Sequence, residues 1–256
     1  MADQGPRTGT QAIERALSVL AVLESGADTA TLTELAHGTG LSPSTTHRLA
    51  RALCEAGLMR QDPDTERYGF GRRLVTLGQR AATALGLGAA RVTLEGLASA
   101  TGESVNLGVR DGDEVLVLLG VSSAQRLRFD QEVGSRIPAY ASAMGKAMLA
   151  YADDPDAVVA ALPRLAKLTG STITSRPALR AELDDVHERG WALNDEEREA
   201  GVRTVAAPVL DRSGHSIAAI AVQGPTIRMT DDRLAEIASL VQGAATEVAG
   251  HLLAPL

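Results

Sequence analysis

The feature that most constrains the fold of this chain is a pair of short helical segments separated by a glycine turn. The first is predicted to begin after Thr31, because Thr31 and Glu34 have the spacing of a capping box, in which each side chain bonds the backbone N–H of the other residue. The run Gly38-Thr39-Gly40 then favours a tight turn. The glycine run therefore ends the first helical segment.

The second helical segment is predicted to run from Ser42 to about Glu55. Ser42 is a preferred N-cap residue, and Pro43 follows at the first helical position, where its missing N–H costs nothing. Gly57 is expected as the C-cap. Two short helices with a glycine turn between them, the second opening with SPSTTHR, predict a helix-turn-helix.

A hairpin is predicted directly after these helices. Residues 58–61 and 67–70 are strand-like and are joined by the turn Asp62-Pro63-Asp64-Thr65. Apolar residues between positions 11 and 23 recur at helical spacing ahead of the pair. We therefore predict a winged helix-turn-helix over residues 11–71. Residues 1–10 have no apolar periodicity and are expected to form a disordered arm.

The rest of the chain is predicted to form a linker helix, residues 72–86, and a second domain, residues 87–254. The helical pattern from 72 to 102 is interrupted by Gly86-Leu87-Gly88. Strands are expected at 103–110, 114–121, 125–132, 202–210 and 215–223, and helices at 143–152, 154–162, 176–189 and 230–253. This order favours an antiparallel sheet with helices on its faces, which is an α+β architecture.

The charge is distributed unevenly between these two parts. The net charge is −7, but residues 1–80 carry 9 basic and 9 acidic residues, whereas residues 81–256 carry 16 basic and 23 acidic residues. Residues 41–80 contain seven arginines against four acidic residues. The excess acid therefore lies outside the helix-turn-helix, where a modest basic stretch is suited to phosphate contact.

The outward face of the second helix supplies the candidate DNA contacts. Leu49, Ala50 and Leu53 share one face, which is predicted to be the core side. Small hydroxyl residues at the helix N-terminus suit close approach to phosphate, and arginine is the commonest reader of guanine. The predicted contacts are Ser42, Ser44, Thr45, His47, Arg48 and Arg51 on the helix and Arg60 and Arg67 in the wing. A solvated helix face, and generic surface charge in the wing, are the alternatives.

Five segments resemble the isocitrate lyase regulator (IclR) family of bacterial transcriptional regulators. They are QAIERALSVLAVL, the stretch from LTELAH to LVTLG, VGSRIPAYASAMGKAMLA, GWALNDEEREAGVRTVAAPVLDRSG and SIAAIAVQGPTIRMT. The resemblance covers the chain from Gln11 to Leu253. It implies a dimer or dimer of dimers that reads palindromic double-stranded operator DNA. It also implies a C-terminal GAF-like, or profilin-like, α/β domain with a six-stranded sheet that binds a small-molecule effector.

The resemblance also implies which residues contact the effector. Carried over by position, they are Phe129, Ile137, Ala143, Met144, Asn194, Val202, Thr204, Ala221 and Gln223. Ala143 and Ala221 stand where relatives often have Gly and Ser, and Asn194 stands where an acidic residue is common, so the effector's identity does not carry over. From the residues alone, Ala143-Met144-Gly145 opens a helix whose backbone N–H groups suit a carboxylate, which adds Gly145. Ordinary strand and loop roles for the polar members stay open.

Two other classes of function are considered. An enzyme is not expected, because the chain contains no G-x-S-x-G, no H-E-x-x-H and no glycine-rich phosphate loop. The carboxylates Asp195, Glu196, Glu197 and Glu199 are interpreted as a solvated loop rather than a catalytic group. A protein-interaction module that uses the winged helix as a docking surface is the second alternative.

No cofactor, metal site or membrane partner is expected. The five histidines are scattered, without a carboxylate or cysteine at ligand spacing. The single cysteine, Cys54, cannot form an internal disulfide, and no secretory leader pattern opens the chain, so a cytoplasmic location is expected.

Overall fold

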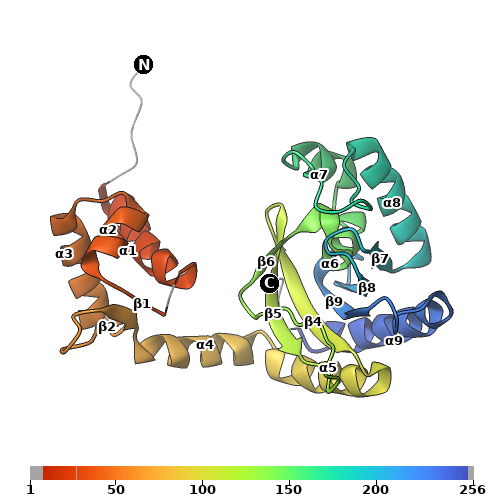
Figure 1. Cartoon of the computed structure of the whole chain (residues 1–256), viewed down its shortest axis with the longest axis horizontal. Coiled ribbons are helices and arrows are strands. Elements are labelled where there is room, and N and C mark those ends of the chain that lie inside the picture. The colour runs from red at the N-terminus through yellow and green to blue at the C-terminus, as the bar shows by residue number, and fades with distance from the viewer. Residues whose placement is uncertain (1–7, 27, 253–256) are drawn as a thin grey trace. The chain divides into compact units, whose positions relative to one another are not determined.

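The structure is a computed structural model that describes residues 8–26 and 28–252. The chain divides into two compact units, residues 1–82 and 83–256 (Figure 1). Each unit is considered separately below.

The first unit is a winged helix-turn-helix, as predicted. Its elements are α1 (Thr8–Glu24), β1 (Thr29–Ala30), α2 (Leu32–Thr39), α3 (Pro43–Glu55), β2 (Met59–Gln61), β3 (Tyr68–Phe70) and α4 (Arg72–Ala84). The hairpin β2–β3 is extended by β1, a two-residue strand that was not predicted, in the order β1-β3-β2. The three helices and the sheet enclose one apolar core that includes Val19, Leu23, Leu35, Ala50, Leu53, Met59 and Tyr68.

The local signals at the helix ends are confirmed, with two corrections. Thr31 and Glu34 form the capping box: the Glu34 N–H donates to Thr31 Oγ1 at 3.2 Å, and the Thr31 N–H donates to Glu34 Oε2 at 2.7 Å. The C-cap of α3 is Ala56, and Gly57, with a φ of +74°, follows it rather than capping the helix. The disordered arm is wrong for residues 8–10, which begin α1, because extending a formed helix by a turn needs no apolar face. Residues 1–7 lie outside the described residues.

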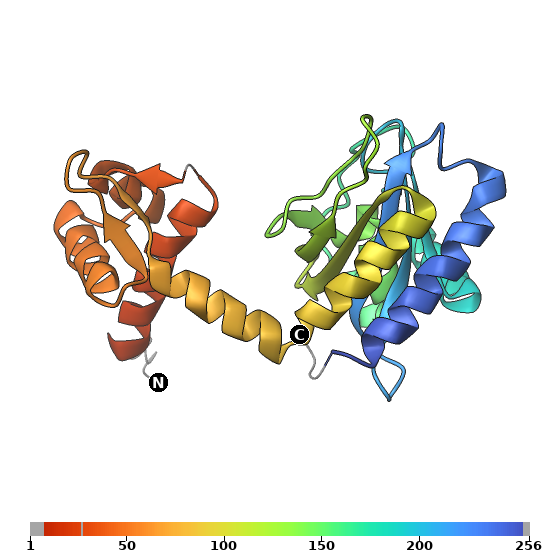
Figure 2. The ribbon, with the colours of Figure 1, turned by 90° about the horizontal axis from the view of Figure 1, so that it is seen from below.

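The second unit is built on a six-stranded antiparallel sheet in the order β6-β5-β4-β9-β8-β7. The strands are β4 (Ser104–Asp111), β5 (Glu114–Val121), β6 (Arg136–Pro138), β7 (Ala192–Asp195), β8 (Val202–Leu210) and β9 (Ser216–Pro225). Helices α5 (Leu87–Thr101) and α9 (Asp231–Ala249) cover one face (Figure 2). The other face carries the short 3-10 helix η1 (Ala139–Ala141), α6 (Ala143–Ala150), α7 (Pro155–Ala161) and α8 (Arg176–Arg189). The α+β class is confirmed.

Two edges of this sheet differ from the prediction. The strand expected at 125–132 is wrong: the segment has no strand, and side-chain bonds hold it instead, as where Ser104 Oγ donates to Asp130 at 2.8 Å. The edge position is taken by β6, and β7, also not predicted, forms the opposite edge. Helix α9 ends at Ala249, short of the predicted 253. Among the described residues, no helix is both long and apolar enough to cross a membrane.

Candidate functional site

The first candidate site is the outward face of α3. Its side chains Ser44, His47, Arg48 and Arg51 are exposed, while Ala50 and Leu53 are buried in the core. Leu49, which was assigned to the core side, packs against that core as a partly buried side chain. The division of the helix into a core face and an outward face therefore follows the sequence pattern.

The N-terminal turn of α3 is organised by Ser42. The Ser42 Oγ accepts the backbone N–H of Thr45 at 3.3 Å and lies 2.9 Å from the Thr45 hydroxyl. Pro43 has no N–H to offer, so within the described part of the chain the first-turn N–H without an intramolecular acceptor is that of Ser44. The helix end thus presents one backbone donor beside two hydroxyl groups, which suits one phosphate oxygen.

The two arginines of this face differ. Arg51 forms an ion pair with Glu55 at 3.0 Å, in which both side chains are about two-thirds or more exposed, at 73% and 66%. Such a pair contributes little to stability, so Arg51 can exchange Glu55 for a phosphate. Arg48 has no ion pair or hydrogen bond with any of the described residues and is available without a competing partner.

The two wing arginines also differ. Arg60 on β2 is exposed, whereas the Arg67 guanidinium donates to the Thr29 hydroxyl and carbonyl at 2.9 Å and 2.8 Å. It also pairs with Glu34 at 3.1 Å. Arg67 therefore ties β1 to the capping box of α2, a role that the sequence reading missed because Thr29 lies 38 residues away. We do not include Arg67 in the candidate DNA surface.

The leucines of α4 and α5 differ in exposure. Leu77 on α4 is 47% exposed, but Leu94 and Leu97 on α5 are buried in the core of the second unit. Leu74 and Leu85 are half-buried. Exposed Phe70 and Val75 line one apolar groove of the first unit together with Leu74.

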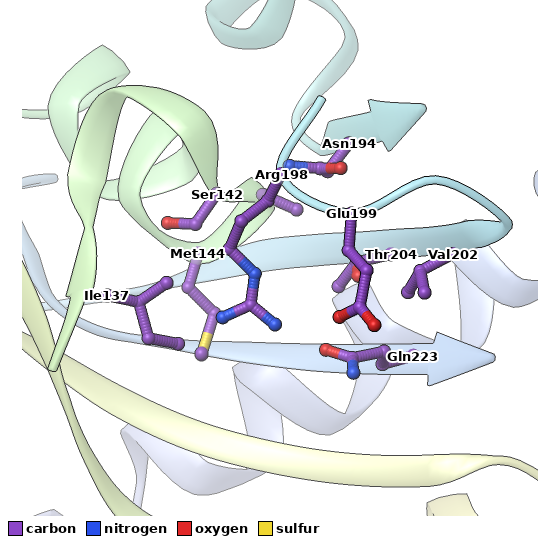
Figure 3. A pocket seen from close by; sticks show the side chains of 10 residues that line it. Ile137, Ser142, Met144, Asn194, Arg198, Glu199, Val202, Thr204 and Gln223 are labelled. Atoms are coloured by element: carbon purple, nitrogen blue, oxygen red, sulfur yellow. The ribbon is translucent and has the colours of Figure 1, made fainter. Parts of the chain in front are cut away.

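The second candidate site is a small pocket in the second unit, between the N-terminus of α6, the loop 196–201 and the strands β8 and β9 (Figure 3). Its volume is about 20 Å³, which is room for about one water molecule. Ten residues line it: Ile137, Ser142, Ala143, Met144, Asn194, Arg198, Glu199, Val202, Thr204 and Gln223.

The sheet register explains why distant residues meet in this pocket. Asn194 on β7 pairs with Thr204 on β8, and Thr204 pairs with Gln223 on β9. The three polar side chains therefore form one row across three strands, and all three line the pocket below α6.

Seven of the ten residues expected to contact the effector line the pocket, and Phe129, Gly145 and Ala221 do not. The N–H of Gly145 bonds the Ser142 Oγ at 3.0 Å, and a Cβ at Gly145 would lie 2.1 Å from the Ala139 carbonyl oxygen. Gly145 is therefore a packing position. Ala221 is buried within the sheet, paired with Ala206.

The α6 N-terminus retains part of the predicted donor set. The Ser142 Oγ accepts the Gly145 N–H. The N–H groups of Ala143 and Met144 therefore remain in the first turn without an acceptor among the described residues. They face the same cavity as Ser142.

Asn194 shapes the pocket wall. Its amide donates to the Ala141 carbonyl at 2.5 Å, and its carbonyl oxygen accepts the Glu197 N–H at 3.1 Å. Asn194 thereby ties the loop 196–201 to the segment preceding α6. Its polar atoms already have partners, so it positions the site more than it offers groups to a ligand.

Three lining residues were missed: Ser142, Arg198 and Glu199. The carboxylates between Asp195 and Glu199 were interpreted as a solvated loop because they lie so close together in the sequence. Glu196 has a φ of +57° and Gly201 a φ of +81°, and between them the chain turns back over the pocket. The signal in the sequence was Gly201 soon after an acidic run, which marks a turn but not its direction.

Arg198 is the one cation that lines the pocket. It donates to Gln131 Oε1 at 3.2 Å, and Gln131 donates to Gln223 Oε1 at 3.3 Å. Burial lowers the pKa of Arg198, against a smaller opposite effect of the Glu199 charge. Among the described residues, no carboxylate lies within ion-pair distance of Arg198.

The carboxylates of the 195–199 run serve separate structural roles. Asp195 pairs with Arg203, and Glu196 accepts the Gly201 N–H at 2.7 Å. Glu197 is buried and lies 2.5 Å from Lys146 Nζ, while Glu199 faces the pocket. In the described part of the chain, no group of three His, Cys, Asp or Glu residues is arranged to hold a metal ion.

A buried charge network lies behind the pocket. Lys146 on α6 is 1% exposed and bonds both Glu197 and, at 3.3 Å, Glu182 on α8, which also pairs with Arg189 at 2.9 Å. Burial raises the pKa of Glu197 despite the nearby Lys146 charge. The network fixes the loop on which Arg198 and Glu199 stand.

Comparisons with known proteins match both units. The family model of the IclR helix-turn-helix domain matches residues 12–63, and that of the bacterial transcriptional regulator IclR C-terminal domain matches residues 86–249.

The chain is similar to named regulators over nearly its whole length. It is 36% identical to the HTH-type transcriptional regulator BhcR of Paracoccus denitrificans over 242 residues, 94% of this chain and 86% of that protein. It is 33% identical to the transcriptional repressor IclR of Escherichia coli over 249 residues, 95% of this chain and 90% of that protein. The crystal structure of a transcriptional regulator of this type from Alicyclobacillus acidocaldarius superposes with a TM-score of 0.85 at 26% identity, covering 94% of this chain and 98% of that one.

Proposed function

This chain belongs to the IclR family of bacterial transcriptional regulators, and we propose that α3 reads operator DNA while the pocket below α6 binds the controlling effector. The observation that carries the first half is the exposed face of α3. There Arg48, which has no ion pair or hydrogen bond with the described residues, lies near a helix N-terminus suited to phosphate.

Within this surface Arg48 contacts a base edge. Arg51 breaks its ion pair with Glu55 and contacts a phosphate. Ser44, with Ser42 and Thr45 behind it, contacts the backbone and fixes the register of the helix in the major groove. Arg60 in the wing contacts phosphate or the adjacent minor groove. His47 lies on the same exposed face and joins the phosphate contacts.

The active form is a homodimer or dimer of dimers on a palindromic operator. A single winged helix reads too few base pairs for useful specificity, and two-fold symmetry doubles the site. The exposed apolar groove lined by Phe70, Leu74 and Val75 supports a contact between two copies at this unit.

The effector is a small organic acid, and the protein acts in the cytoplasm. An anion is favoured by the N–H groups of Ala143 and Met144 and by the Arg198 guanidinium. Arg198 has no ion pair with the described residues, so its charge is available to the ligand. An effector changes DNA affinity only through its different affinity for two states of the protein, and coupling of about 1 to 3 kcal/mol is typical.

The experiment that tests the DNA surface starts with a duplex selected by the full chain from a randomised pool. Fluorescence anisotropy then compares wild type with Arg48→Ala and Arg51→Ala. Arg91→Ala is the control, because Arg91 on α5 is also exposed and also faces a glutamate one turn on. Arg48→Ala is expected to weaken binding by about 10- to 100-fold.

Salt dependence separates this function from a protein-docking role. Binding to the selected duplex is expected to weaken steeply between low and physiological salt, because phosphate contact releases counterions. If no duplex is enriched, or both variants bind like wild type, the assignment of this face fails.

A further inference from the structure

The pocket presents opposite charges from neighbouring residues of one loop. Arg198 and Glu199 both enter it from the segment 196–201, Arg198 on the side of Met144 and Glu199 on the side of Val202 and Thr204 (Figure 3). The two are not within ion-pair distance of each other. Two charged groups that share a small cavity without neutralising each other leave both available to a third molecule.

The positive end is built from more than Arg198. The α6 N-terminus, with the N–H groups of Ala143 and Met144, lies on the Met144 side as well. Helix N-termini and guanidinium groups favour the same ligand group, a carboxylate. Arg198 is also held in place, because Gln131 accepts from it and bridges it to Gln223.

The other end of the pocket accepts hydrogen bonds. Glu199 is an exposed residue whose backbone carbonyl accepts the Val202 N–H at 3.4 Å, but its carboxylate has no hydrogen bond or ion pair with the described residues, and neither does the Thr204 hydroxyl. A carboxylate can only accept hydrogen bonds when ionised, so a ligand group placed there must be a donor. A ligand with carboxylates at both ends would meet repulsion at Glu199.

We infer that the effector is a short acid of two to four carbons carrying a hydroxyl or ammonium donor next to its carboxylate, held by Arg198 at one end and Glu199 at the other. This inference rests on the proposed effector role of the pocket. The cavity, with a volume of about 20 Å³, favours a small ligand, and a molecule of two to four carbons fits only if the side chains of Arg198 and Glu199 move aside as it enters. The apolar side chains of Ile137, Met144 and Val202 contact the short carbon chain.

Four three-carbon probes test the inference with the full-length wild-type protein. Propionate has the carboxylate alone, lactate adds a hydroxyl, alanine adds an ammonium, and lactamide lacks the charge of the acid. Isothermal calorimetry measures each dissociation constant. Lactate or alanine, or both, are expected to bind about 10-fold more tightly than propionate, and lactamide more weakly than any acid. The comparison of lactate with alanine tells a hydroxyl effector from an ammonium one.

Two variants separate the two ends of the pocket. Arg198→Gln keeps a hydrogen-bond donor but removes the charge, and is expected to weaken all three acids by about 10- to 100-fold. Glu199→Leu removes both the charge and the hydrogen-bond acceptor, and is expected to bring lactate and alanine to within about 3-fold of propionate. The controls Arg212→Gln and Glu188→Leu change exposed residues elsewhere in this unit and are expected to bind as wild type.

The outcomes distinguish this inference from the proposed function. If Ala143→Leu abolishes acid binding but Arg198→Gln does not weaken it, the pocket is the effector site and the inference is wrong. If the acids bind wild type and Ala143→Leu equally, the proposed site itself is wrong. Propionate binding as tightly as lactate and alanine, or no acid binding up to about 10 mM, also overturns the inference.

Discussion

Replacing Lys146 by methionine tests the buried network behind the pocket. The substitution leaves Glu197 buried without its 2.5 Å partner, and its second oxygen, Oε2, already has no hydrogen-bond partner. Removing one member of a buried ion pair costs about 3 to 5 kcal/mol, because the remaining charge stays desolvated. For a chain of this size that corresponds to a fall in melting temperature on the order of 10 °C.

The loss of stability in Lys146→Met is expected to depend on pH, and the titration of Glu197 sets the direction of that dependence. Burial already raises the pKa of Glu197, and removing the Lys146 charge, which lowers that pKa, raises it further. A raised carboxylate pKa stabilises the fold while the group is protonated and loses that stabilisation as pH rises through the folded pKa. The deficit of Lys146→Met is therefore largest at pH values above the raised pKa of Glu197 in the folded variant, and it shrinks as pH falls toward and below the ordinary pKa of 4.5.

Fluorescence of Trp191, the single tryptophan of the chain, follows unfolding of this unit. Arg189 of the same network stacks over its ring at 4.7 Å. The double variant Lys146→Met with Glu197→Gln is expected to recover most of the loss and to show little pH dependence. Arg180→Met, which breaks half-exposed pairs with Asp156 and Asp184, is expected to cost under about 1 kcal/mol. A loss that is below about 1 kcal/mol, or equal at every pH, refutes the reasoning.

Three further predictions concern other parts of the chain. Arg67→Ala removes three hydrogen bonds between β1, α2 and the wing, and is expected to destabilise the first unit by about 1 to 3 kcal/mol. Chemical unfolding followed by circular dichroism measures it, and an effect on DNA affinity alone, without a stability change, contradicts the structural role. Val75→Glu places a charge in the exposed apolar groove lined by Phe70, Leu74 and Val75, and is expected to shift the oligomer toward monomer in sedimentation, whereas Glu95→Gln on α5 serves as control. An unchanged oligomer places the interface elsewhere. Ala143→Leu fills the mouth of the pocket, so the acid that raises the wild-type melting temperature most is expected to give no shift in this variant. Ala160→Leu on the exposed side of α7 should keep the shift, and a normal shift in Ala143→Leu counts against the pocket.

Much of the fold could be predicted because its signals act over a few residues. A cap joins positions three apart, as Thr31 and Glu34 do, and a hairpin turn joins strands only a few residues long. The strand at 114–121 and the helix at 176–189 have the predicted bounds. The strand predicted at 125–132 was wrong because the alternation of apolar and polar residues there does not come from strand pairing. Side-chain hydrogen bonds, such as that of Asp130, hold the segment instead.

The candidate site was predicted in part. Seven of the residues that the family resemblance and the helix opening implied as effector contacts line one pocket, including Thr204 and Gln223. No pattern in the sequence indicated that Arg198 lines the pocket. Sequence reasoning also included Arg67 in the DNA surface, which its bonds to Thr29 do not favour.

The sequence by itself determined where helices begin, which face of α3 is outward and that the two halves differ in charge, since these depend on neighbours along the chain. Only the tertiary structure decided which charged residues face the pocket. Arg198 and Glu197 are adjacent in sequence, yet one lines the cavity and the other is buried against Lys146. That difference follows from the turn between Glu196 and Gly201 and from the packing of α6 against the same sheet. Lys146 on α6 lies 51 residues before Glu197 in the chain. No local pattern encodes the direction of a side chain that is set by such distant contacts.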